Sequence, residues 1–411
     1  CINCYRCVRA CEEIQGEMVL NMSGRGFATH IIKGFDTSFN LSACVSCGAC
    51  VQTCPTDALH DKFQTKTLKP ESTVRTTCTY CGVGCQLEVA LIDGEIRGIQ
   101  APVSAEVNEG HTCLKGRFAF QFYNHPDRLR DPLIKKNGRF EVVTWDEAYD
   151  FMTERLLKVK NKYGADAIGC ISSSRATNEE NYLMQKMTRV ALNTNNIDGC
   201  ARVCHAPTAY GMQKSFGTGA ATNSIEDLKA TDCILMFGAN PTEAHPVTGA
   251  RIKQLFMQGI TSIVVDPVRT SLAELATYHL QLRPGTNVAL LNMMAHYILE
   301  AGLVKEEFIR RYTEQFEAFR DHVRELDMDE LEVLTGVPKE LVRQAALAYA
   351  SADNAMEFHG LGVTEHFQGS KTVMLLSNLA MMTGNVGRPG TGLNPLRGQN
   401  NVQGAADMGV Q

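Results

Sequence analysis

The chain has 411 residues, 44% of them hydrophobic and 21% charged, so it is long enough for several domains and has the composition of a globular protein. Its formal net charge is −5 and it contains no stripe of lysine or arginine, which argues against nucleic acid or an anionic membrane as the main partner. No apolar run approaches the length of a membrane span, and 16 cysteines without secretory features favour a reducing cytoplasm in which thiolates bind metal.

The first 54 residues contain two copies of one cysteine spacing, C-x-x-C-x-x-C-x-x-x-C. This is the iron–sulfur spacing of two-cluster bacterial ferredoxins, in which the fourth thiolate of each run binds the other cluster. Scattered or disulfide-bonded cysteines are the alternative, and two copies in tandem argue against it. We therefore predict one [4Fe–4S] cluster on Cys1, Cys4, Cys7 and Cys54, and a second on Cys44, Cys47, Cys50 and Cys11. Residues 1–62 would form this α+β module, and the polar residues 63–74 a linker.

A third cysteine group follows, with three close members and one distant one: Cys78, Cys81, Cys85 and Cys113. This pattern suits a further [4Fe–4S] cluster. A zinc site is the alternative, because C-x-x-C also begins many zinc sites. Residues 86–99 alternate in polarity around Asp93-Gly94, which predicts a β-hairpin within a cluster domain of residues 75–135.

Residues 136–411 have the pattern of an α/β protein. Helical periodicity covers residues 145–163, 178–192, 246–258 and 288–301, and short apolar strands are predicted at 167–171, 233–238, 262–265 and 355–360. Strands that alternate with helices predict parallel sheets, and we expect Cys170 and Cys233 in their core. The clearest unit, residues 231–266, has a loop after its first strand and Asp266 after its second. Such a loop is where phosphates bind, although Gly-x-Asn-Pro is not the dinucleotide fingerprint.

Two segments carry possible catalytic groups. Cys204 and His205 are adjacent, and they could be a soft metal ligand beside an acid/base, or a buried thiol and a hydrogen-bonded imidazole. Arg397 lies among amide side chains and could grip an anion bidentately or form a surface ion pair. We expect Cys200 to be a packing residue and His111 to lie at the surface or to be hydrogen-bonded.

Taken together, these segments resemble the catalytic subunits of molybdenum- or tungsten-dependent formate dehydrogenases, which bind a bis-molybdopterin guanine dinucleotide. The resemblance rests on the third cysteine group with Cys113-Leu-Lys-Gly116, on Arg202-Val-Cys-His205, and on residues 238–246, 265–267, 384–389 and 397–405. The first module resembles the ferredoxin-like extension of cytoplasmic members. The resemblance implies Rossmann-like domains with parallel sheets, and a longer polypeptide with a C-terminal barrel cap of which this chain would be a segment.

The resemblance also implies roles for single residues. Cys204 would ligate the metal, His205 would be an acid/base with a pKa near neutrality, Arg397 would orient formate, and Gln399 would line the same pocket. Lys115 would lie between the third cluster and one pterin. Cofactor contacts are implied for Gly238, Asn240, Glu243, His245, Asp266, Gly285, Asn287, Gly384 and Asn385. Asn287 departs from the family, which often has Asp there, and His245 could instead begin its helix.

The implied activity is oxidation of formate to CO2, with electrons leaving through three [4Fe–4S] clusters to a partner subunit. That partner would be an NAD(P)-reducing flavoprotein or a hydrogenase- or ferredoxin-type iron–sulfur subunit. Two other functions remain open. One is a non-catalytic electron-transfer subunit resembling the large iron–sulfur subunit of respiratory complex I, and the other is a related oxidoreductase such as a nitrate reductase.

Overall fold

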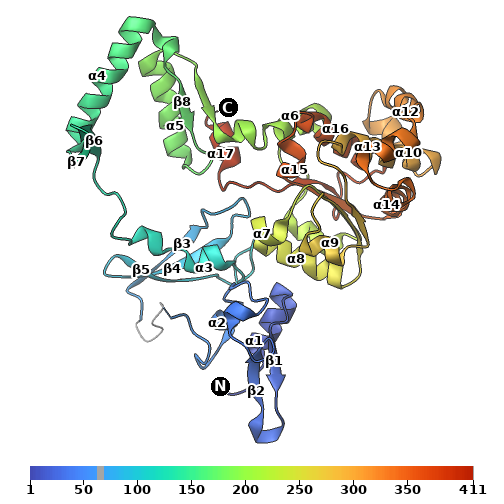
Figure 1. Cartoon of the computed structure of the whole chain (residues 1–411), viewed down its shortest axis with the longest axis horizontal. Coiled ribbons are helices and arrows are strands. Elements are labelled where there is room, and N and C mark those ends of the chain that lie inside the picture. The colour runs from blue at the N-terminus through green and yellow to red at the C-terminus, as the bar shows by residue number, and fades with distance from the viewer. Residues whose placement is uncertain (63–68, 411) are drawn as a thin grey trace.

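The computed structural model describes residues 1–62 and 69–410, so the predicted linker lies partly outside the described residues. Figure 1 shows the cysteine-rich N-terminal part at one end, a small β-rich part beside it, and a larger α/β part on the other side. None of the helices in the described ranges is long and apolar enough to cross a membrane.

Residues 1–62 contain short helices and one antiparallel pair of strands. The helices are α1 (Arg6–Arg9), η1 (Ala10–Gln15), η2 (Gly26–Ala28), η3 (Phe39–Leu41) and α2 (Ala49–Thr53), and the strands are β1 (Leu20–Ser23) and β2 (His30–Lys33). This part packs against helix α8 (Pro246–Met257), where Lys253 Nζ lies 2.8 Å from Glu17 Oε1 and Gln254 Nε2 donates to the Glu12 carbonyl at 2.6 Å. The end of the first cysteine run is therefore held directly against the α/β part.

The middle part is a three-stranded antiparallel sheet of β3 (Ser72–Thr77), β4 (Gln86–Ile92) and β5 (Glu95–Gln100), followed by helix α3 (Leu114–Phe118). Asp93 and Gly94 connect β4 to β5 with φ angles of 54° and 73°, the left-handed conformation of a tight hairpin turn. The predicted hairpin is confirmed.

The centre of the α/β part is a five-stranded parallel sheet, which confirms the predicted parallel arrangement. Its strand order is β12 (Tyr278–Leu280), β11 (Thr261–Val265), β10 (Cys233–Phe237), β13 (Ala355–His359) and β14 (Gly392–Pro395). Every residue of β10 is buried, because helices cover both faces of the sheet. Leu235 faces the core that includes residues of α10 (Asn287–Glu300), α14 (Lys339–Ser351) and α16 (Gly369–Met382), whereas Ile234 faces α8 and α9 (Ser271–Leu275). The remaining helices here are α6 (Ala206–Phe216), η8 (Ile225–Ala230), α7 (Pro241–Ala244), α11 (Glu306–Tyr312), α12 (Phe316–Arg324), α13 (Met328–Thr335), α15 (Leu361–Thr364) and α17 (Val402–Asp407).

Residues 133–199 form an arm that stands away from this sheet in Figure 1. It contains the hairpin β6 (Leu133–Lys136) and β7 (Arg139–Val142), helices α4 (Trp145–Tyr163), α5 (Asn178–Lys186) and η6 (Met187–Leu192), and the parallel pair β8 (Cys170–Ser172) and β9 (Ile197–Gly199). Helix α4 has the predicted bounds. The strand predicted at 167–171 begins later, because residues 165–167 form a 3₁₀ turn, and Cys170 is only partly buried whereas Cys233 is fully buried.

Candidate active site and cysteine groups

Cys204 and His205 lie at the junction between η7 (Cys200–Val203) and α6, where the chain leaves β9. Pro207 in the first turn of α6 suits a helix start, since its missing N–H would have no partner there. Cys204 is buried, and burial raises the pKa of its thiol; the Glu365 carboxylate adds to the rise and the Arg397 guanidinium opposes it. The structure therefore places the predicted metal-ligating thiol within electrostatic range of the predicted formate-binding cation.

Arg397 follows the carboxyl end of β14, and hydrogen bonds to its main-chain carbonyl fix its position. Its carbonyl accepts one hydrogen bond from the Gly82 N–H at 3.0 Å and another from His245 Nε2 at 2.7 Å. Its guanidinium donates to the Gly219 carbonyl. Burial lowers the pKa of Arg397 to about 10, and the nearby Cys204 acts in the opposite direction, so the side chain is still a cation at neutral pH. A cavity of about 230 Å³ lies beside Arg397 and is also lined by Gly82, His245 and Asn394.

His205 is hydrogen-bonded on both ring nitrogens. Nδ1 lies 3.1 Å from the Thr208 hydroxyl, which lies 3.0 Å from His359 Nε2, and the His205 Nε2 lies 3.1 Å from the Leu396 carbonyl. The arrangement is consistent with His359 donating to Thr208, Thr208 donating to His205, and His205 donating to Leu396. Burial first, and then the Arg397 charge, lower the pKa of His205 to about 3. The predicted pKa near neutrality is therefore wrong: the imidazole is neutral.

Cys200 is not the simple packing residue that we predicted. Its Sγ accepts the Ser174 N–H at 3.1 Å and hydrogen-bonds Gln399 Oε1 at 3.0 Å. Burial alone would raise the pKa of Cys200, but the hydrogen bonds that it accepts from Ser174 lower it. Gln399 is thus tied to the turn that carries Cys204.

Seven predicted cofactor residues lie at the carboxyl edge of the sheet or in loops beside it. Gly238 follows β10 with φ 55°, and a Cβ there would lie 2.8 Å from Gly362 Cα, so the close approach of two loops requires glycine. Asp266 follows β11, and burial raises its pKa. The Asn287 amide donates to the Gly362 carbonyl at 3.0 Å. The others are Glu243 in the short helix α7 after β10, Asn240 and His245 at the two ends of that helix, and Gly285 before α10.

Gly384 and Asn385 do not join this group. The Asn385 Oδ1 accepts from the N–H of Ala355, the first residue of β13, and its Nδ2 donates to Thr383. These two residues therefore lie at the amino edge of the sheet, opposite the other loops. The Asn385 amide is used to cap a strand, and the predicted cofactor contacts of Gly384 and Asn385 stay a prediction that this placement does not support.

The third cysteine group encloses the start of α3. Burial, and then the negative charge of the neighbouring Cys78, Cys81 and Cys113, raise the pKa of Cys85 to about 12. Lys115 is exposed on α3, and its ammonium acts to lower the pKa of Cys81, which burial raises. Four such thiolates could be ionised together only around positively charged metal, which fits an iron–sulfur cluster.

In the described part of the chain no three cysteines are arranged closely enough to form a ready metal site, so the two exchanged ligand sets stay a prediction, but their members are neighbours. Cys1, Cys4, Cys7 and Cys54 line one cavity of about 460 Å³. Burial raises the pKa of Cys50 to about 12, with additional contributions from Cys47, Cys44 and Cys11. Cys1 and Cys4 are exposed, so the first set lies at the surface.

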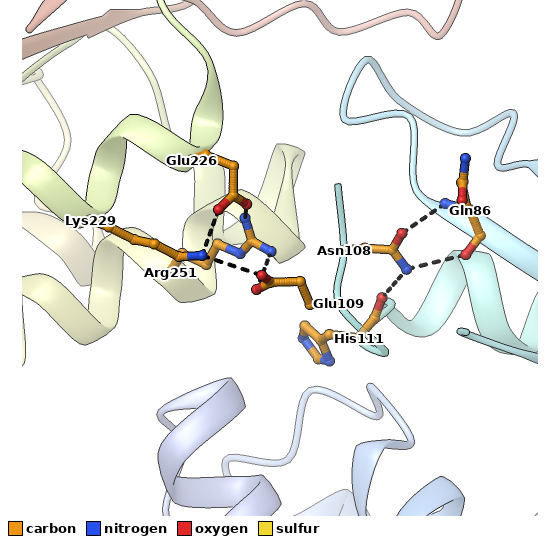
Figure 2. Close-up of polar contacts among 7 residues, drawn as sticks. All are labelled: Gln86, Asn108, Glu109, His111, Glu226, Lys229 and Arg251. Atoms are coloured by element: carbon orange, nitrogen blue, oxygen red, sulfur yellow. Dashed lines mark hydrogen bonds and ion pairs between the residues drawn. The ribbon is translucent and has the colours of Figure 1, made fainter. Parts of the chain in front are cut away.

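An ion-pair network joins the middle part to the α/β part. Figure 2 shows Glu109 facing Lys229 and Arg251, with Glu226 pairing with the same two cations. The nitrogen–oxygen distances from Glu109 are 3.3 Å to Lys229 and 3.0 Å to Arg251. Beside it, the buried His111 hydrogen-bonds Gln15 at 3.0 Å, so its hydrogen bonding is confirmed and its surface position is not.

Sequence reasoning missed Thr208, His359, Gly82 and Arg117 as neighbours of the site. His359 could have been noticed because it ends a parallel strand, where ligands of open α/β sheets gather. Gly82 gave no signal, since its closeness to Arg397 depends on the packing of two parts of the chain.

Comparison with known families matches three consecutive regions. Residues 1–58 match the 4Fe-4S dicluster domain, residues 71–125 the molybdopterin oxidoreductase Fe4S4 domain, and residues 128–410 the molybdopterin oxidoreductase family. The chain is 46% identical over 337 residues to the F420-dependent formate dehydrogenase subunit alpha of Methanocaldococcus jannaschii, covering 82% of this chain and 49% of that protein. It is 43% identical over 344 residues to formate dehydrogenase H of Escherichia coli, covering 82% of this chain and 48% of the relative.

A putative formate dehydrogenase of Staphylococcus aureus matches the full chain at 36% identity, over 46% of its own length. The chain thus spans about half the length of the curated relatives it matches. Among solved structures, acetylene hydratase from Pelobacter acetylenicus has a TM-score of 0.67 at 24% identity, covering 75% of this chain and 43% of that chain. This last likeness concerns the fold alone.

Proposed function

The chain belongs to the molybdopterin oxidoreductase family, and from this premise we propose that it is the catalytic region of a formate dehydrogenase. It would oxidise formate to CO2 at molybdenum or tungsten held by a bis-molybdopterin guanine dinucleotide, and the reverse direction would be CO2 reduction. The electrons would pass through three [4Fe–4S] clusters to a cytoplasmic partner subunit, either an NAD(P)-reducing flavoprotein or a hydrogenase- or ferredoxin-type iron–sulfur subunit. The division into residues 1–62, 75–135 and 136–411, with a linker at 63–74, is part of this proposal.

One observation supports the proposal: the buried Cys204 thiol and the buried Arg397 guanidinium are close enough for each to shift the pKa of the other. When bound, the pterin-held metal supplies a two-electron acceptor, the chemistry that the side chains themselves lack. Cys204 suits the metal as a soft ligand, because burial disfavours its thiolate unless a positive charge lies beside it.

Arg397 would bind and orient formate. A guanidinium forms paired, charge-assisted hydrogen bonds with a carboxylate, roughly twice as strong as neutral ones. Since Gly82 and His245 fix the Arg397 carbonyl, the side chain starts from a defined backbone position. His205, which is neutral and hydrogen-bonded on both nitrogens, would serve as a fixed polar group, and a proton could reach it only if one of those bonds opened.

The cysteine groups are ordered outward from the site by their contacts. Cys81 precedes Gly82, which bonds Arg397, so the third group is nearest to the proposed formate site. Arg117 links that group to Cys47 of the second set. The first set, which includes Cys1 and Cys4, lies at the surface, where a partner subunit could exchange electrons.

Substitution of the two central residues tests the proposal. We expect Cys204→Ala and Arg397→Ala each to lower formate-dependent dye reduction at least about a hundredfold, the scale of losing one charge-stabilising group. Cys170→Ala and Arg310→Ala are matched controls, because both residues lie outside the site. Unchanged turnover in either test variant would refute the role of that residue.

A further inference from the structure

Arg117 touches residues of two different cysteine groups. Its backbone N–H donates to the Cys113 carbonyl at 3.0 Å in the first turn of α3, so its position is tied to the third group. Its side chain extends into the N-terminal part, where Nε donates to the Cys47 carbonyl at 2.8 Å and Nη1 donates to Gln52 Oε1 at 2.8 Å. The side chain therefore spans the contact between the two parts of the chain.

The N-terminal part is shaped to accept this guanidinium. Gly48, next to Cys47, has φ 72°, and a Cβ there would lie 2.2 Å from Arg117 Cδ. Gln52 completes the contact, because its amide also exchanges hydrogen bonds with Ala101 at the end of β5, at 2.7 and 3.1 Å. Such a fit holds the Cys44–Cys50 segment in one position against α3.

Arg117 also brings a buried positive charge next to the thiols. The residue is 2% exposed, and its Nη2 has no hydrogen-bond partner among the residues that the structure describes. The negative groups that act on its charge are the thiols of Cys47, Cys50 and Cys113 and the carboxylate of Asp61. An unpaired N–H donor that is buried beside cysteines is suited to the sulfur atoms of an iron–sulfur cluster.

We propose that Arg117 is a positioning residue that holds the second ferredoxin-like cluster, on Cys11, Cys44, Cys47 and Cys50, beside the third cluster and raises its reduction potential. This inference rests on the iron–sulfur content of the proposed function. Reduction adds one electron, and hence one negative charge, to the cluster. A buried cation and its hydrogen bonds stabilise that added charge, because charge and hydrogen bonding at the sulfurs set the potential. The electron can then leave the third cluster for the second.

Redox titration of the purified holo-assembly, followed by electron paramagnetic resonance with dithionite as reductant, tests the proposal. We expect Arg117→Gln to lower the equilibrium constant for reduction of the second ferredoxin-like cluster at least about tenfold. For a one-electron couple this is a downward shift of its reduction potential by about 59 mV. Arg117→Lys keeps the positive charge but loses the planar guanidinium with its several N–H donors, so the shift in reduction potential should be smaller. The cluster on Cys1, Cys4, Cys7 and Cys54 should keep its potential, as should all clusters in the exposed control Arg130→Gln.

Arg117→Gln with full iron content and unchanged potentials would overturn the proposal. Loss of the cluster in both Arg117 variants would also overturn it, in favour of a purely structural role. Dithionite reduces the clusters without formate, molybdenum or tungsten, so a shifted potential in an assembly that does not oxidise formate would contradict only the proposed function.

Discussion

Glu357 allows a quantitative test of the fold beneath the site. It lies on strand β13, between β10 and β14, and is fully buried, with the Tyr349 hydroxyl donating to Oε1 while Oε2 has no partner among the described residues. Burial raises the pKa of Glu357 from 4.5 to about 8, and the Tyr349 bond offsets only part of the rise. At neutral pH the folded protein must therefore hold a proton that the unfolded chain has released.

The sign and size of the effect follow from this difference. Below pH 4.5 the raised pKa of Glu357 does not lower the free energy of unfolding. Between pH 4.5 and pH 8 it lowers that free energy by about 1.36 kcal/mol per pH unit, and above pH 8 the loss is constant. Glu357→Gln keeps the shape and the acceptor for Tyr349 but needs no proton. Relative to the unchanged protein, its free energy of unfolding should rise by about 3 kcal/mol between pH 5 and pH 7.5.

Urea unfolding followed by circular dichroism at these two pH values measures the difference, with exposed Glu154→Gln on α4 as the control. A stability difference between the Glu357→Gln variant and the unchanged protein that is the same at pH 5 and pH 7.5 would refute the reasoning.

Three further predictions concern the sites. Cys54→Ser should remove about four irons per chain, because Cys54 lines the cavity with Cys7, and unchanged iron content would contradict the exchanged ligand sets. Thr208→Val should lower the free energy of unfolding by about 1–3 kcal/mol, since two buried imidazoles lose their shared partner; a urea midpoint equal to that of the unchanged protein would argue against the hydrogen-bond chain. Glu109→Gln should cost less than about 1 kcal/mol, and the loss should shrink in 1 M salt, because its ion pair with Lys229 is exposed; a larger loss that does not depend on salt would contradict this.

The sequence predicted best what depends on local chemistry. Helix α4 has its predicted bounds because Thr144 and Glu147 form a capping box at its start and Gly164 follows its end. The buried strand β10 was found because a central parallel strand is apolar throughout. Strands β12 and β14 were missed because they have three and four residues and little pattern of their own.

What depends on packing between distant segments was not predictable in the same way. The resemblance gave Cys204 and Arg397, but the hydrogen bonds that fix Arg397 come from Gly82 and His245, far away in the sequence. The low pKa of His205 arises from burial under the sheet edge, which a sequence motif does not report.

The metal content of the purified native assembly tests the central proposal most directly. Elemental analysis should find about twelve irons, three clusters of four, and about one molybdenum or tungsten per chain. Iron in that amount without either heavier metal would contradict the proposal and favour a subunit that only transfers electrons.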